Sequence, residues 1–218
     1  MPSIEEAVEA LLTSKKQSPN RLAALGTHLI ERFQATGLKL EPGDATEVGI
    51  RGLGRQKDWD LAFVLAGKPR LLISLKSILK NLAGTVPNRL DDLMGEAANV
   101  QQLSPEIVIG YVVVMDEADD SNRREGDGTW SDHFESNLNK IAIRKAPLWN
   151  QGLIEAAWVI KINSKMPVNQ RISRPQAISE HSSRFISNLL SELYLREPTL
   201  RPLATAKDRG LQVKPLAE

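Results

Sequence analysis

Three residues of chemically useful types stand near the ends of two neighbouring apolar runs. Asp60 opens the first run, and Ser74 and Lys76 close the second. A carboxylate can hold Mg²⁺, and a lysine beside it can orient a water molecule and offset the charge of a phosphate. If the fold brings Asp60 and Lys76 together, the pair suits metal-assisted hydrolysis of a phosphate ester.

The two apolar runs predict the strands of a β-hairpin. The strands are expected at residues 59–66 and 71–76, and Gly-Lys-Pro at 67–69 is typical of the turn between them. Because side chains alternate along a strand, Ser74 and Lys76 share one face.

A turn centred on Lys68 also predicts the pairing of the two strands. Asp60 then lies opposite Lys76, and Ala62 lies opposite Ser74. The carboxylate and the ammonium group would line one patch of the hairpin.

Hydrophobic periodicity and turn residues predict an α/β fold in which a mixed central β-sheet is flanked by helices. Loops are expected at 51–56, 77–87, 116–130 and 164–175, with Asn88 as the N-cap of the helix that follows the second loop. Besides the hairpin, strands are expected at 46–50, 107–115 and 153–162, and helices at 4–36 with a break at 18–20, 88–103, 131–145 and 177–195.

The ordered set of motifs resembles the PD-(D/E)XK nuclease superfamily, in particular type II restriction endonucleases. In that family an Asp opens one strand, and an acidic residue, any residue and a Lys close the next, which Asp60 and Lys76 match. The segments 54–60 (GRQKDWD), 87–97 (PNRLDDLMGEA) and 153–160 (LIEAAWVI) are also similar to segments of such enzymes. The resemblance covers roughly residues 45–165 and implies a restriction-endonuclease-like core.

Ser74 departs from the family pattern, because it stands where the acidic metal ligand is expected. The missing acid could come from elsewhere in the fold, the nuclease could be inactive, or a natural Glu could have been replaced. Some restriction enzymes with S-x-K recruit an acid from the following helix. Here Asp92 and Glu96 lie four apart on one side of that helix, and the longer reach of Glu96 favours it narrowly.

The resemblance also suggests residues around the catalytic pair. Glu47, upstream of the hairpin, is a candidate third metal ligand, with a surface glutamate as the equal alternative. Candidate contacts to DNA phosphates are Arg51, Arg55 and Lys57 before the hairpin, and Asn88 and Arg89 at the expected helix start.

Together these features predict a Mg²⁺-dependent endodeoxyribonuclease, most simply a type II restriction enzyme that cuts double-stranded DNA. The family implies products with 5′ phosphates, and cutting both strands suggests a homodimer. The alternatives are an inactive DNA-binding module of the same fold and a structure-specific repair nuclease. We expect one nuclease domain over 1–218, with N-terminal helices at 1–36, a catalytic core at 45–165, a C-terminal helix at 175–197 and a tail at 198–218.

The composition agrees with a globular protein. The 218 residues carry a net charge of +1, 41 % are hydrophobic, and none is cysteine, which excludes disulfides and thiolate metal sites. The longest apolar run, residues 107–115, is too short to span a bilayer, and the acidic N-terminus does not resemble a signal peptide. We therefore expect a cytoplasmic protein without membrane partners.

Overall fold

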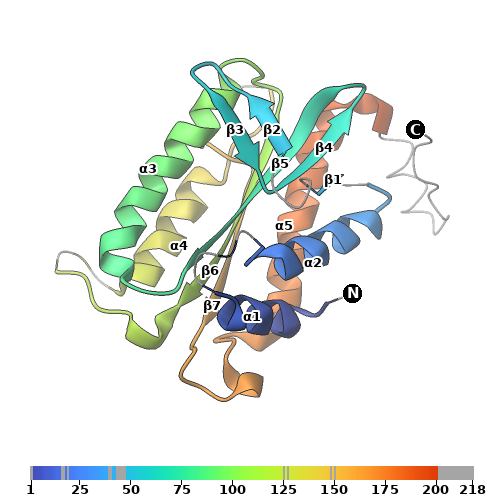
Figure 1. Ribbon diagram of the computed structural model, residues 1–218. Helices are drawn as coiled ribbons and strands as arrows, with labels where there is room; N and C mark the ends of the chain where they lie inside the picture. Colours follow the sequence, from blue (N-terminus) through green and yellow to red (C-terminus); the bar gives the residue numbers. More distant parts are fainter. Residues whose placement is uncertain are drawn as a thin grey trace.

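The chain forms a mixed α/β structure with helices on both faces of a β-sheet (Figure 1). This computed structural model describes residues 2–15, 18, 20–38, 41–42, 48–124, 126, 128–147, 149 and 151–200. The helices are α1 (Ile4–Thr13), α2 (Ala23–Gln34), α3 (Leu82–Gln101), α4 (Trp130–Ile141) and α5 (Pro175–Arg196), with 3₁₀ turns η1 (Glu117–Asp119), η2 (Val168–Gln170) and η3 (Pro198–Leu200). The strands are β1 (Glu41–Pro42), β2 (Val48–Arg51), β3 (Gln56–Trp59), β4 (Leu61–Leu65), β5 (Lys68–Ile78), β6 (Val108–Asp116) and β7 (Ala156–Ile162).

The main sheet has the order β1-β4-β5-β6-β7, in which β1 contributes only two residues at one edge. Strand β4 runs antiparallel to β5, whereas β5, β6 and β7 are parallel to one another. Helix α3 connects β5 to β6, and α4 connects β6 to β7, as parallel neighbours require. The expected mixed sheet with flanking helices is therefore confirmed.

Strands β2 and β3 form a separate antiparallel pair, which the sequence analysis did not anticipate. The expectation of one strand over 59–66 was wrong, because Trp59 ends β3 and Leu61 begins β4. In Figure 1 the β2–β3 pair and β4 diverge from this point. Asp60 is the single residue at the junction between the two sheets.

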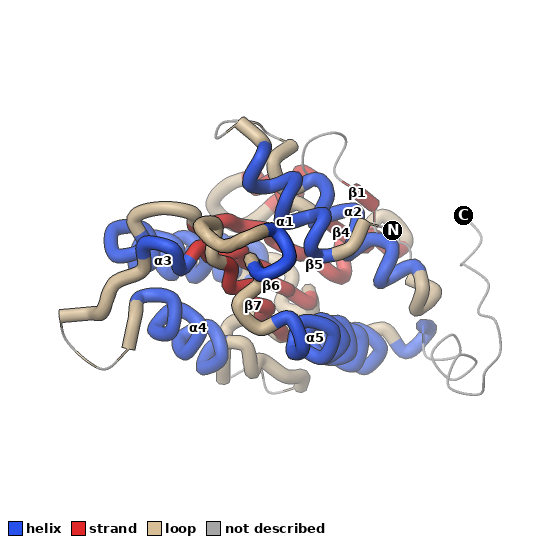
Figure 2. The backbone as a smooth tube through the Cα atoms, turned by 90° about the horizontal axis from the view of Figure 1, so that it is seen from below, coloured by secondary structure: helices blue, strands red, loops and turns tan. Residues whose placement is uncertain are grey.

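Alternating side chains divide the core between the two sheet faces. Along β5, Leu71, Ile73 and Leu75 join a hydrophobic cluster with residues of α1, α2 and α5. Leu72 joins the opposite cluster, which contains residues of α3 and α4. Figure 2 shows these layers, with α3 and α4 on one side of the strands and α2 and α5 on the other.

Local signals explain why several helices form where they do. In α1 the side chain of Ser3 accepts from the backbone N–H of Glu6, and the Glu6 carboxylate accepts from the N–H of Ser3, which makes a capping box. Helix α5 packs closely on the sheet because β6 carries Gly110. A β-carbon there would approach Leu189 and Phe185 to 2.9 Å.

The expected start of the third helix was wrong. Asn81, not Asn88, is the N-cap of α3, and its side chain accepts from the backbone N–H of Gly84 at 3.3 Å. Gly84 and Pro87 suggest a loop in the sequence, but both lie in the first turns of the helix. Pro87 is the sixth residue of α3, so its missing N–H removes one intrahelical hydrogen bond, and the helix continues through it.

The expected hairpin turn was displaced as well. The turn is the dipeptide Ala66-Gly67, whose φ angles of 50° and 74° are those of a two-residue type I′ turn. A register shift at Phe63 and Val64 then adds one residue on the β5 side. Consequently Ala62 pairs with Leu72 and not with Ser74.

Part of the expected C-terminal tail is structured, since η3 covers Pro198–Leu200, while 201–218 lies outside the described residues. Among the helices of the described chain, none is both long enough and apolar enough to cross a bilayer.

Candidate active site

Asp60 is fixed in place by the neighbouring strand. Its Oδ2 accepts a hydrogen bond from the backbone N–H of Leu75 at 2.7 Å. The same oxygen lies 3.8 Å from Nζ of Lys76, and each of the two side chains is 20 % exposed. The carboxylate and the ammonium group are thus held together at a site that solvent still reaches.

The expected opposition of Asp60 and Lys76 was wrong in detail, because the ladder ends at Leu61 paired with Ile73. Asp60 therefore meets Lys76 diagonally, from just beyond the paired segment. The observed pairing of the two strands is shifted from the expected one by two residues, because Ala62 pairs with Leu72 and not with Ser74. Because side chains alternate with a period of two, an even shift leaves both residues on the same face.

Ser74 lies between these residues on the α3 side of the sheet and is almost fully buried, at 2 % exposure. Its ladder partner on β6 is Tyr111, which the sequence analysis did not single out. A tyrosine in the aliphatic strand at 107–115 was the one available signal.

The Tyr111 hydroxyl is buried and has no hydrogen-bond partner among the described residues. Burial raises the pKa of Tyr111 well above its usual value, and Arg89 opposes that shift. The carboxylates of Glu96, Asp92 and Asp60 add to it, so all three acids lie close enough to act on this hydroxyl electrostatically.

The two helix acids differ in their surroundings. Glu96 is buried at 8 % exposure, and its Oε1 lies 2.8 Å from Nζ of Lys57 on β3. Asp92 is exposed and pairs with Arg89 one turn away at 3.1 Å. Of the two, Glu96 is the acid that α3 turns toward the protein interior.

The other predicted site residues are dispersed. Arg51 and Arg55 are exposed at the two ends of the β2–β3 connection, and Glu47 lies outside the described residues. Asn88 and Arg89 are inside α3, about two turns from its start, so the expectation that they occupy a helix N-terminus was wrong.

Asn99 explains how the β2–β3 connection is held. Its Oδ1 accepts from the backbone N–H of Gly54 at 2.8 Å, and its Nδ2 donates to the carbonyl of Arg55 at 2.9 Å. Gly52 faces the same side chain so closely that a β-carbon would approach Asn99 Nδ2 to 2.0 Å. The connection is therefore docked on α3, and this places Lys57 beside Glu96.

The donor set can be compared with the needs of Mg²⁺. Within the described part of the chain, no group of three or more acidic or histidine residues is arranged to hold a metal. Mg²⁺ commonly uses only one or two protein carboxylates and completes its shell with water and substrate phosphate. Asp60 has a second oxygen, Oδ1, with no hydrogen bond among the described residues, and Glu96 supplies another carboxylate. Of these two carboxylates, Asp60 has the free oxygen that such sparse coordination needs, whereas Glu96 is paired with Lys57.

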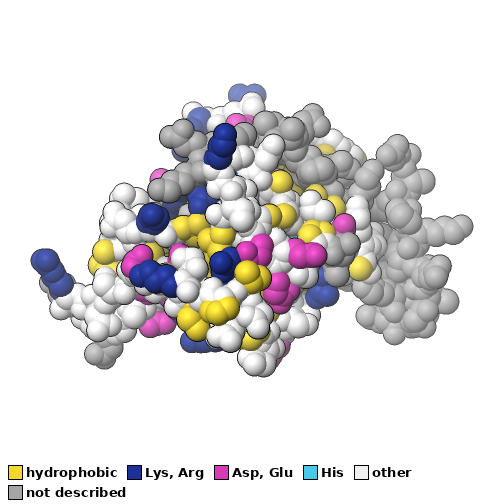
Figure 3. Space-filling model, turned by 60° about the horizontal axis from the view of Figure 1, so that its bottom comes forward, with side chains coloured by type: hydrophobic (Ala, Val, Ile, Leu, Met, Phe, Trp, Pro, Cys, Tyr) yellow, Lys and Arg dark blue, Asp and Glu magenta, His cyan; other side chains and the backbone are white. Residues whose placement is uncertain are grey.

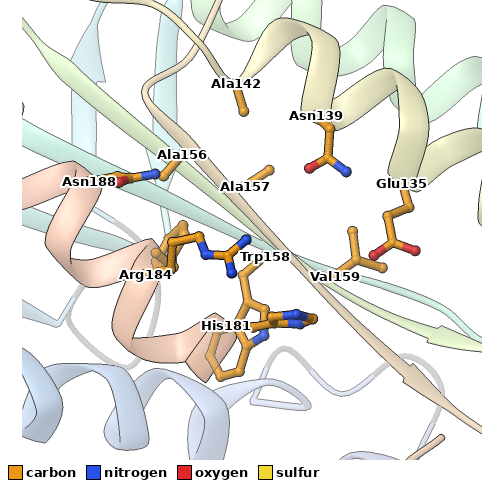
Figure 4. Close-up of a pocket in the computed structure, with 11 residues that line it drawn as sticks. Glu135, Asn139, Ala142, Ala156, Ala157, Trp158, Val159, His181, Arg184 and Asn188 are labelled. Atoms are coloured by element: carbon orange, nitrogen blue, oxygen red, sulfur yellow. The ribbon is translucent and has the colours of Figure 1, made fainter. Parts of the chain in front are cut away.

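A different groove follows the edge of β7, between α4 and α5 (Figure 4). Its volume is about 160 Å³, and its lining includes Glu135, Arg184 and His181. Both charges are already paired within the chain, Glu135 with Lys161 at 3.0 Å and Arg184 with Glu180. The groove thus lacks the partly open acid and lysine pair found at Asp60.

Comparison with models of known protein families and with curated proteins found no match.

Proposed function

We propose that the chain is a Mg²⁺-dependent endodeoxyribonuclease, most simply a type II restriction enzyme acting on double-stranded DNA. The observation that carries the proposal is the pairing of Asp60 with Lys76 at 3.8 Å, with the carboxylate held by the N–H of Leu75. A fixed acid beside a lysine, both partly exposed, suits hydrolysis of a charged ester.

The topology supports the same proposal. Asp60 precedes β4, Lys76 lies near the end of the antiparallel β5, and α3 then leads to the parallel β6. This order agrees with the restriction-endonuclease-like core that the sequence resemblance implies. A fold alone does not define an activity, and the chemistry of Asp60 and Lys76 therefore carries the proposal.

In the proposed reaction, Asp60 and Glu96 would hold Mg²⁺, which neutralises phosphate charge when bound. Lys76 orients the attacking water and stabilises the extra negative charge of the transition state. The water oxygen bonds to phosphorus, the bond from phosphorus to the 3′ oxygen breaks, and protons are exchanged with solvent. The products carry a 5′ phosphate and a 3′ hydroxyl. Two such sites in a homodimer would cut both strands.

One rival has a specific observation in its favour. Ser74 is not an acid, and Glu96 is already neutralised by Lys57 at 2.8 Å. Both facts suit an inactive DNA-binding module that kept the fold.

The test is incubation of the full chain with supercoiled plasmid and phage DNA, in Mg²⁺ and in EDTA. Discrete fragments formed only with Mg²⁺ support a restriction enzyme. Nicking that depends on DNA structure supports a repair nuclease, and binding without cleavage supports the inactive module. Lys76→Met is the negative control for cleavage. It removes the ammonium group at a position outside the hydrophobic core, so cleavage should fall while the fold is kept.

A further inference from the structure

A cavity of about 560 Å³ lies at the carboxyl ends of β5 and β6. Its wall includes the last turn of α1, the segment Leu79–Lys80 that follows β5, and Asp116 at the end of β6. In sheets with parallel strands, ligands commonly bind outside the carboxyl ends of the strands. The position is therefore a natural place for a ligand.

Three cationic side chains line the cavity, namely Arg21, Lys80 and Arg171. Arg171 forms an ion pair with Glu9 and donates to the carbonyl of Met166. By contrast, among the described residues the side chains of Arg21 and Lys80 have no hydrogen-bond or ion-pair partner, and Arg21 Nε is buried. Two cationic side chains thus line the cavity without a direct partner among the described residues.

The acidic groups around the cavity are already occupied. Asp116 Oδ1 accepts from the backbone N–H groups of Ala118 and Ser164, each at 3.0 Å. Lys80 contributes to the lowered pKa of nearby Asp119, but the larger cause is the hydrogen bond from Lys165. Asp116 keeps its negative charge despite these hydrogen bonds, but among the described residues it forms no ion pair with Arg21 or Lys80.

We infer that this cavity binds a phosphate group through Arg21 and Lys80. An arginine fork and a lysine point charge are the usual partners of phosphate oxygens. Figure 3 shows the molecular face on which the strands end, where basic side chains are interspersed with acidic ones. Attraction would therefore come from these two cations and not from a uniformly positive surface.

The assignment of this phosphate to DNA rests on the proposed nuclease function. Lys80 follows Lys76 by four residues, so their Cα atoms are at most about 14 Å apart. A DNA strand carries a phosphate at about every 3.4 Å along the helix axis. The cavity would thus hold a backbone phosphate within about four nucleotides of the bond that is cut.

The first experiment measures binding of a fluorescein-labelled duplex of mixed sequence in EDTA, over a range of KCl concentrations. The logarithm of the binding constant falls linearly with the logarithm of the salt concentration, and each lost phosphate contact makes this slope shallower by about one. The double variant Arg21→Ala/Lys80→Ala should reduce the size of the slope by about one, because the two residues hold one phosphate. The control Lys68→Ala/Lys140→Ala removes the same charge from exposed positions elsewhere and should change it less. Arg21→Lys in place of Arg21→Ala should restore about half of the loss.

The second experiment follows thermal unfolding in inorganic phosphate at constant ionic strength. Wild type should be stabilised, and Arg21→Ala/Lys80→Ala should not respond. Stabilisation without duplex binding would support a free-phosphate site and count against the nuclease proposal. If the duplex binds with the same salt slope in both double variants, and phosphate stabilises neither wild type nor variant, the cavity inference is wrong. The nuclease proposal would then still stand or fall on the cleavage assay.

Discussion

The Asp60 carboxylate is tied to the backbone of the neighbouring strand, where it accepts from the N–H of Leu75 at 2.7 Å. Asp60 stands between two strands that belong to different sheets and has no ladder partner of its own. The hydrogen bond replaces the missing ladder contact and sets the direction of the carboxylate beside Lys76.

The charge of Asp60 can be removed without removing its hydrogen bond. Asp60→Asn keeps an oxygen that can accept from Leu75, so stability should change little while cleavage falls by roughly 10²-fold to 10³-fold. Single-turnover cleavage and thermal unfolding measure the two effects. Asp58→Asn, an exposed neighbour on β3, is the control and should cleave at nearly the wild-type rate. Equal losses in both variants would remove Asp60 from the mechanism.

Lys76 can be tested by its charge in the same way. Lys76→Met keeps the aliphatic stem and should lower cleavage by roughly 10²-fold or more, with duplex affinity less affected. Lys68→Met, in the exposed β4–β5 turn, serves as control. Full activity in Lys76→Met would show that the ammonium group takes no part in the chemistry.

The two helix acids should behave differently. Glu96→Gln is expected to raise the Mg²⁺ concentration required for half-maximal cleavage by about tenfold or more, because a carboxylate near the site is lost. The exposed Asp92, substituted as Asp92→Asn, should leave the requirement almost unchanged. A titration of cleavage against Mg²⁺ decides between them, and the reverse order would make Asp92 the recruited acid.

A buried ion cluster should control stability at the other end of the sheet. The side chain of Glu155 is 0 % exposed and contacts Arg144 at 2.6 Å and Arg196 at 2.8 Å. Glu155→Ala should therefore lower the free energy of unfolding by about 3–5 kcal/mol, since it leaves buried charges unpaired. Glu180→Ala, which removes an exposed ion pair with Arg184, should change it by no more than about 1 kcal/mol. Urea denaturation compares the two variants.

The pair Asp132 and Lys161 predicts a pH effect on stability. A hydrogen bond from Lys161 lowers the pKa of Asp132, although burial opposes the shift. For Lys161, burial lowers the pKa, but the hydrogen bonds to Asp132 and Glu135 outweigh it and raise the pKa overall. The pair therefore connects α4 to β7 while both groups are charged.

Because the folded-state pKa of Asp132 is lowered, its contribution is complete above the unfolded value of about 3.9 and disappears as the pH falls through the folded value. The contribution of Lys161 is complete below about pH 10.4 and disappears as the pH rises through its raised value. Asp132→Asn should flatten the acid side of a plot of unfolding free energy against pH. An unchanged acid limb would contradict this assignment.

Part of the site could be predicted from local sequence. The two-residue period of strands placed Asp60, Ser74 and Lys76 on one face, and this survived the wrong turn and the bulge because the register moved by an even number. Turn and cap positions were less reliable, since Gly84 and Pro87 are typical of loops yet lie in α3.

What the sequence by itself determined is the alternation of apolar and polar residues, and with it the α/β class and the face on which the reactive side chains lie. Only the tertiary structure decided that Leu75 holds Asp60, that Glu96 is buried while Asp92 is exposed, and that Tyr111 pairs with Ser74. The physical reason is that periodicity is a property of neighbours along the chain. These contacts join residues 15 or more positions apart, and packing between elements selects them.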